Sequence, residues 1–180
     1  HLQQEGLVTA GARGTLRVHM HSPAEIRELY QVRAALEGLA VTLLTASQQR
    51  ETAVQMLREA VSRLDESHRS LSEHIDADLA FHLLLCELSG NSVLVNTWKH
   101  LEGRVRITIL SDGDENHHQI MSTSHHAPIV DAIEAGDAFQ VVFARGHRCG
   151  AGQRQFCGGA FEADVFGGGD AVVEADRGDE

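Results

Sequence analysis

The sequence predicts a mainly α fold, an antiparallel bundle of about six helices preceded by a short β-hairpin. Hydrophobic residues make up 42% of the 180 residues but aromatic residues only 4%, a balance typical of cores built from Leu, Ala and Val. From Ser22 onward, apolar residues recur at three- and four-residue steps. Short polar connections separate these periodic segments, as expected for neighbouring antiparallel helices.

Residues 1–21 have a different character from the rest of the chain. HLQQEGLV is typical of a helix that ends at Gly6, since glycine readily adopts the left-handed conformation after a helix. LVTAGARGTLRV predicts two short strands around a Gly-Ala-Arg-Gly tip. Because two strands alone are marginally stable in water, we expect this piece to be the end of a further domain. The start at His1 rather than Met favours the same interpretation.

Residues 22–148 are predicted to form the helical domain. Ser22 is expected to be an N-cap, with Pro23 at the first helical position and Glu25 closing a capping box. Ser70 and Glu73 repeat this box at the start of another helix. After the first helix we expect helices at about 51–67, 70–90, 92–110 and within 124–136, and a sixth beginning near 137.

Residues 149–180 form a glycine- and acid-rich tail. Nine of the seventeen glycines fall in residues 146–180, which show no helical period. This composition predicts an irregular or disordered segment. A C-terminus altered by cloning or by a change of reading frame is an alternative that the sequence leaves open.

The composition also excludes some classes of protein. A net charge of −11 argues against a nucleic-acid-binding surface over the bulk of the chain. No run approaches the roughly 18 apolar residues of a membrane helix, so we expect no membrane partner. Cys86, Cys149 and Cys157 lack metal-type spacing, which favours a reducing, cytoplasmic setting.

The predicted helix at 70–90 contains two polar residues on a largely apolar segment, DADLAFHLLLCELSGN. Asp78 and His82 are four residues apart and therefore point the same way. One interpretation is an Asp–His hydrogen bond satisfied inside the core. The other is a metal site that uses carboxylate oxygen and imidazole nitrogen.

Further histidines decide between these interpretations. His126 shares a stripe with Ile129, Val130 and Ile133, and His147 is in phase with Phe143 on the apolar side of the last predicted helix. Solvated positions are expected for the others downstream, His117, His118 and His125. Three core-facing histidines and one core-facing acid, from three helices, favour the metal site.

Four segments resemble the FadR subgroup of the GntR transcription regulators, over residues 1 to about 147. This family joins a winged helix-turn-helix to an all-helical effector domain called FCD. EGLVTAGARGTLRV is similar to the end of the recognition helix and the wing, so residues 1–21 would be a remnant of the DNA-binding domain. Three further segments resemble parts of the FCD domain: ELYQVRAALEGLA, DLAFHLLLCELSGN with its Asp-x-x-x-His, and HAPIVDAIEAGD.

The resemblance implies a set of site residues. The positions that match the family's metal ligands are Asp78, His82, His126 and, in the last helix, His147. These would hold one divalent cation, with zinc, nickel, manganese and iron equally compatible with the ligands. A small carboxylate effector would bind at the open metal positions.

Arginines are the candidates for contacts with the effector and with DNA. Arg33 is suited to clamp a carboxylate, and an ordinary surface salt bridge with Glu37 is the alternative. Arg104 is a weaker effector-binding candidate of the same kind. Arg13 and Arg17 would approach operator DNA from the wing.

The resulting functional prediction is a homodimeric transcription regulator whose helical domain senses an organic acid through a metal, and which is not an enzyme. The alternative is a metal-dependent hydrolase that uses the same Asp/His site. Such an enzyme needs a general base near the metal. Glu37 and Glu87 are the nearest acids by pattern, and neither is persuasive.

Overall fold

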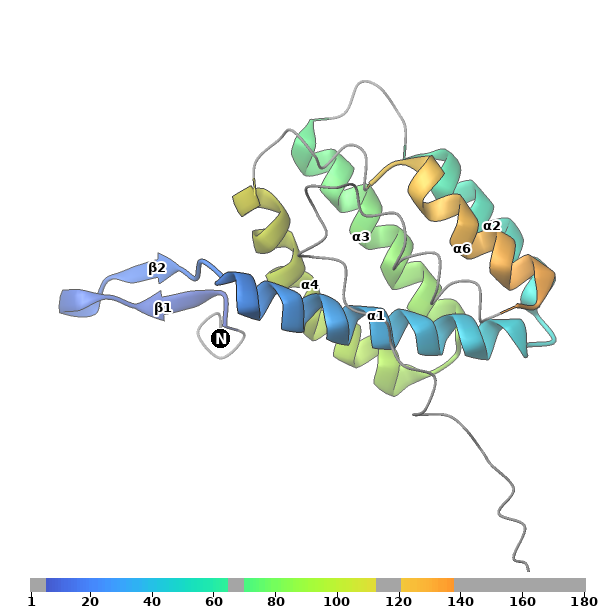
Figure 1. Cartoon of the computed structure of the whole chain (residues 1–180), viewed down its shortest axis with the longest axis horizontal. Helices are drawn as coiled ribbons and strands as arrows, with labels where there is room; N and C mark the ends of the chain where they lie inside the picture. The colour runs from blue at the N-terminus through green and yellow to red at the C-terminus, as the bar shows by residue number, and fades with distance from the viewer. Residues whose placement is uncertain (1–5, 65–69, 113–120, 138–180) are drawn as a thin grey trace, which may run out of the picture.

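The computed structural model describes residues 6–64, 70–112 and 121–137. Within them the chain is mainly helical, with one two-stranded antiparallel sheet at its N-terminal side, which confirms the predicted fold class (Figure 1). The elements are β1 (Val8–Ala10), β2 (Leu16–Val18), α1 (Pro23–Thr45), α2 (Arg50–Ser62), α3 (Leu71–Leu88), α4 (Ser92–Asp112) and α6 (Thr123–Ala135).

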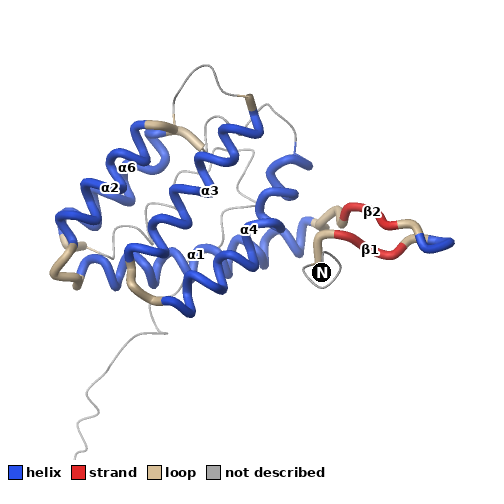
Figure 2. The backbone as a smooth tube through the Cα atoms, turned by 180° about the vertical axis from the view of Figure 1, so that it is seen from behind, coloured by secondary structure: helices blue, strands red, loops and turns tan. Residues whose placement is uncertain are grey.

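The predicted hairpin is present and projects from the end of the bundle where α1 begins (Figures 1 and 2). Val8 pairs with Val18 and Ala10 with Leu16. The tip contains Arg13 at φ 60° and Gly14 at φ 77°. A non-glycine residue in this left-handed region is uncommon and is accommodated here by the tight turn.

Two helices begin at the predicted capping boxes. The Ser22 hydroxyl accepts from the Glu25 backbone N–H at 3.3 Å, and Glu25 accepts from the Ser22 backbone N–H at 2.8 Å. Ser70 and Glu73 make the same reciprocal pair at the start of α3. Each box satisfies backbone donors that a helix start otherwise leaves unpaired.

The helices pack around α3, which contacts α1, α2 and α4. The helices α2 and α6 lie side by side, and α1 and α4 pack together along another side of α3 (Figures 1 and 2). The largest fully buried side chains include Trp98, Phe81, Leu57 and Ile75. No helix in the described ranges is both long and apolar enough to cross a bilayer.

One boundary differs clearly from the prediction. The second helix ends at Ser62 rather than near residue 67, and Arg63 and Leu64 form a turn with backbone bonds to Ala60 and Val61. The last described helix, α6, agrees with the predicted segment within 124–136, and Pro128 lies inside it. The sixth helix predicted from residue 137 and the tail at 149–180 lie outside the described residues.

Candidate metal centre

Helix α3 supplies the first two polar groups of the candidate site. Asp78 and His82 both lie on its buried face, with exposed fractions of 3% and 0%. Their helical spacing brings the Asp78 Oδ1 and the His82 Nε2 atoms 3.8 Å apart. Burying this carboxylate costs several kcal/mol unless opposite charge or hydrogen bonds offset the cost, so its neighbours decide whether the arrangement is stable.

Helix α6 brings His126 to the same point from 44 residues away in the chain. Its Nε2 atom lies 3.0 Å from Asp78 Oδ1 and 3.1 Å from His82 Nε2. One ligand atom from each of the three residues lies within 4.8 Å of the other two, and all three residues are buried. The structure therefore brings together three of the four predicted metal ligands; the fourth, His147, lies outside the described residues.

Hydrogen bonding selects the tautomer of His126. Its Nδ1 lies 2.9 Å from the backbone carbonyl oxygen of Ser122, one turn earlier. A carbonyl only accepts, so Nδ1 carries the proton and donates it. Nε2 is then the nitrogen that faces Asp78 and His82: unprotonated it can bind a metal ion, and protonated it donates to the Asp78 carboxylate.

Two residues of α1 form a charged layer behind the site. The Arg33 Nε donates to Glu37 Oε1 at 2.8 Å, and Arg33 Nη2 lies 3.7 Å from Asp78 Oδ2. The same Glu37 oxygen lies 2.9 Å from His82 Nδ1, although off the direction of a good hydrogen bond. Its negative charge at this distance favours the tautomer that leaves His82 Nε2 unprotonated. Arg33 and Glu37 are therefore a buried pair and not the surface salt bridge considered above.

The electrostatics favour an ionised carboxylate beside a neutral imidazole. Burial raises the pKa of Asp78, but the adjacent His82, His126 and Arg33 outweigh it and hold that pKa well below its usual range. Burial and the nearby Arg33 charge lower the pKa of His82. Both directions favour the protonation states in which these groups bind a metal.

Aromatic residues enclose the site. Phe81 packs edge-on against both imidazoles, with ring centroids 5.2 Å from His82 and 4.9 Å from His126. The Trp98 ring of α4 lies 5.7 Å from His82, and the Arg33 guanidinium lies over it at 5.5 Å. The indole Nε1 of Trp98 is buried and has no hydrogen-bond partner among the described residues.

The donor set fits a divalent cation. Ligand atoms about 2.0–2.1 Å from a tetrahedral zinc are about 3.3 Å from one another. The observed separations of 3.0, 3.1 and 3.8 Å bracket this value. With Nε2 unprotonated on both imidazoles, all three atoms can offer a lone pair to the same cation. When bound, the ion would supply Lewis acidity and open positions for an anionic oxygen.

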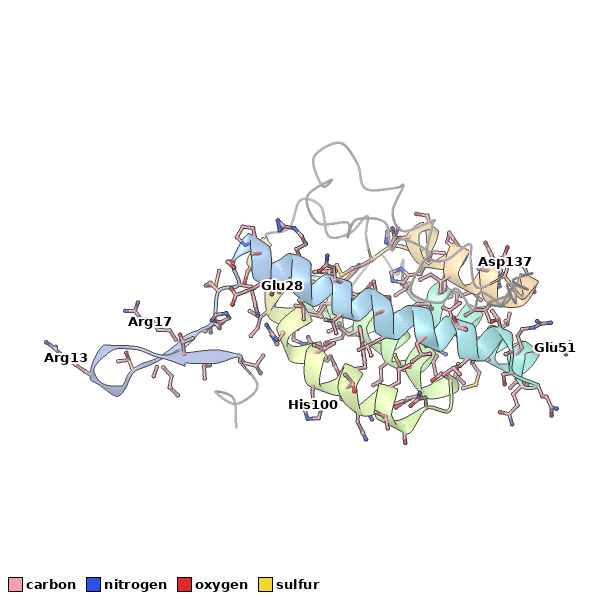
Figure 3. All side chains as sticks on the ribbon, turned by 60° about the horizontal axis from the view of Figure 1, so that its bottom comes forward. Arg13, Arg17, Glu28, Glu51, His100 and Asp137 are labelled. Carbon is pink, nitrogen blue, oxygen red and sulfur yellow. The ribbon has the colours of Figure 1, made fainter. Side chains whose placement is uncertain are left out.

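The other predicted site residues lie elsewhere. Arg104, near the hairpin end of α4, donates from Nε to His21 Nε2 at 3.4 Å. Arg13 and Arg17 are exposed on the hairpin and point away from the bundle (Figure 3). His125, expected to be solvated, is half-buried with its ring centroid 5.7 Å from that of His126. His117 and His118 lie outside the described residues.

Sequence reasoning missed three contributors to the site: the Ser122 carbonyl, the Glu37 carboxylate beside His82, and Trp98. Glu37 carried a usable signal, because it shares a helical stripe with Leu29, Ala40 and Leu44, all buried in α1. Trp98 and Ser122 gave no such signal in the sequence. A tryptophan in an apolar helix is expected to be an ordinary core residue, and a backbone carbonyl has no sequence signature.

Comparison with known protein families identifies the family of this helical domain. Residues 28–144 match the FCD domain. The chain belongs to the FCD domain family. This match contains the three candidate ligands, Asp78, His82 and His126, together with Arg33 and Glu37.

The FCD chain is also similar to two curated proteins, each named "Glc operon transcriptional activator". The one from Escherichia coli strain K12 is 30% identical over 128 residues, which cover 64% of this chain and 50% of that protein. The one from Escherichia coli O6:H1 gives the same values. The chain spans about half the length of these relatives. Both relatives carry the name of a transcriptional activator.

Proposed function

We propose that this FCD domain senses a small organic carboxylate through a divalent cation held by Asp78, His82 and His126. The observation that carries the proposal is the convergence of one carboxylate oxygen and two imidazole nitrogens, all buried, within 4.8 Å. A bound carboxylate would complete the coordination of the cation. In this proposal His147 is the fourth protein ligand.

Arg33 is the residue we assign to the effector. It is a buried cation beside the metal group, with Nη2 3.7 Å from Asp78 Oδ2, and its guanidinium can pair with a second carboxylate. Arg104 has less support for this role because its side chain bonds His21. The effector and the metal together would bias the packing of the helices, as an allosteric ligand must.

A hydrolase has less support from the geometry. Glu37 accepts from Arg33 and lies against His82, so it is committed to the second layer of the site. Glu87 is exposed and pairs with Lys99 at 3.6 Å. Neither acid is placed as a general base.

In this proposal the whole protein is a GntR-type transcription regulator, an assignment supported by the FCD match and by the similarity to the two activators. Residues 1–21 would end a winged DNA-binding domain, 22–148 would form the effector domain, and 149–180 would be an irregular tail. The exposed Arg13 and Arg17 on the projecting hairpin support contacts with operator DNA. A homodimer in the cytoplasm would bind the operator. The 180-residue chain by itself is expected to bind DNA weakly in an electrophoretic shift, and tight, specific binding would contradict this division.

Metal analysis combined with calorimetry tests the function. Protein loaded with zinc or nickel and chelator-treated protein are each titrated with a panel of small mono- and dicarboxylates. We expect a carboxylate to bind only the metal-loaded protein and to be recovered unchanged. Equal binding without metal would overturn the sensor, and conversion of the bound acid or an ester would favour the hydrolase. The Asp78→Ala variant should lose both metal and carboxylate.

A further inference from the structure

The hairpin is seated on α4 by a close packing contact. Gly103 lies in the middle of α4, and a Cβ at this position would approach the Leu7 side chain to 3.1–3.2 Å. The glycine therefore leaves room for Leu7, whose backbone carbonyl accepts from His19 N–H at 2.9 Å to close the base of the hairpin. The contact joins the segment before α1 to a helix more than 80 residues later in the chain.

A ring of hydrogen bonds lies beside this packing contact. Arg104 Nε donates to His21 Nε2 at 3.4 Å, and Thr108 Oγ1 lies 3.4 Å from His21 Nδ1. The Thr108 hydroxyl hydrogen is used on the Arg104 backbone carbonyl at 2.9 Å. Thr108 must then accept from Nδ1–H, so only one neutral tautomer of His21 satisfies every partner.

We propose that His21, Arg104 and Thr108 form a latch that positions the N-terminal hairpin on α4 and opens when His21 is protonated. In this proposal Arg104 is a positioning residue that acts through His21. Protonation would turn Nε2 from an acceptor into a donor facing the guanidinium, which breaks the ring and places two positive charges together.

The surroundings of His21 are consistent with a neutral imidazole. Three charged or titratable groups face it: Arg104 from α4, Glu25 from α1 and His19 from its own segment. Partial burial, then Arg104 and His19, lower the pKa of His21, while Glu25 opposes them. Glu25 itself is held by the Ser22 backbone N–H and lies 3.2 Å from His19 Nε2. Among the charged groups, Arg104 has the largest influence on His21.

The position of the latch relates it to the metal centre. His21 lies two residues before the start of α1, the helix that carries Arg33. Arg104 and Thr108 lie on α4, the helix that carries Trp98 beside the site. A shift of α4 relative to α1 would change the distances in the latch. The hairpin would then respond to the state of the site, a consequence that rests on the proposed function.

The latch itself can be tested in chelator-treated protein without metal, effector or DNA. In ¹⁵N-histidine-labelled protein, long-range proton–nitrogen spectra read the tautomer and titration of each histidine. We expect His21 to carry its proton on Nδ1 and to titrate below its ordinary value of 6.5. Arg104→Gln should raise that midpoint, whereas Arg106→Gln, on the same helix but paired with Asp76, should leave it unchanged.

Amide hydrogen exchange reports whether the hairpin stays seated. Protection of the His19 amide should fall roughly two- to tenfold in Arg104→Gln and Thr108→Val, the loss expected for one hydrogen bond. Thr108→Ser keeps the hydroxyl and should restore protection, and lowering the pH through the His21 midpoint should mimic Arg104→Gln in the wild type. A His21 midpoint that Arg104→Gln does not move, or protection that is independent of pH, would overturn the latch. Adding metal and carboxylate afterwards tests the link to the site separately.

Discussion

The Nε2 atoms of His82 on α3 and His126 on α6 face each other at 3.1 Å, although the two residues are 44 positions apart in the chain. His126 donates its Nδ1 proton to the Ser122 carbonyl oxygen, so Nε2 is the nitrogen that faces His82 and Asp78. Asp78 Oδ1 completes the group at 3.0 Å from His126. Three potential ligand atoms gathered in a buried space form a site suited to a cation.

Removal of one ligand should abolish metal binding. Asp78→Asn and His126→Gln are expected to lower the affinity for zinc or nickel by more than about 100-fold, because changes behind the ligands alone cost about 10- to 100-fold. Mass-spectrometric metal analysis after dialysis gives the measurement. His125→Gln is the matched control, adjacent in sequence but outside the ligand group, and a metal content that follows His125 instead would contradict the assignment.

The buried pair of Arg33 and Glu37 should show strong coupling in stability. Glu37→Met should destabilise the metal-free fold by about 3–5 kcal/mol, because it deprives a buried guanidinium of its hydrogen-bonded carboxylate and leaves only the more distant Asp78. Replacing both residues with Met should recover much of that loss. Urea unfolding of the two single variants and the double variant gives the coupling energy, and additive losses would show that the pair acts as two independent residues.

The capping box of α1 should make the free energy of unfolding fall as the pH is lowered through the acidic range. Hydrogen bonds from the Ser22 backbone and hydroxyl, with a further one from His19, lower the pKa of Glu25 from 4.5 to about 2. Between these values the unfolded chain binds a proton that the folded chain does not, so this contribution is present above pH 4.5 and is lost as the pH falls toward 2. The difference in melting temperature between wild type and Glu25→Gln should therefore shrink on acidification. Glu28→Gln, outside the box on the same helix, should show no such trend.

Trp98 should report metal binding directly. It is the sole tryptophan of the chain, and its ring lies 5.7 Å from that of His82. Nickel, with a partly filled d shell, should quench its fluorescence, whereas zinc, with a filled shell, should not quench by this route and should compete with nickel. A titration in His126→Gln should lose the quenching. Quenching that persists there would place the nickel at another site.

Cys86 should be chemically inert in the folded protein. Burial, together with the negative charge of Glu37, raises the pKa of its thiol to about 12, so almost no thiolate exists near neutral pH. In a Cys149→Ser, Cys157→Ser background, a disulfide reagent at mildly alkaline pH should react only after urea unfolds the chain. Rapid reaction of the native protein would show that this face of α3 opens to solvent.

The sequence by itself determined the local features of this protein. Capping residues placed the starts of α1 and α3, and the four-residue spacing set Asp78 and His82 on one face, because these features depend only on nearby residues. Boundaries without caps were less certain, as the early end of α2 at Ser62 shows.

Only the tertiary structure decided how distant residues meet. The arrival of His126 at Asp78, the burial of Arg33 with Glu37, and the placement of Arg104 at His21 instead of the metal group all depend on how helices rotate and cross. Helical periodicity states which face of a helix is buried, but not which neighbour it meets or at what height. Those quantities come from side-chain packing across the whole bundle, which no local pattern encodes.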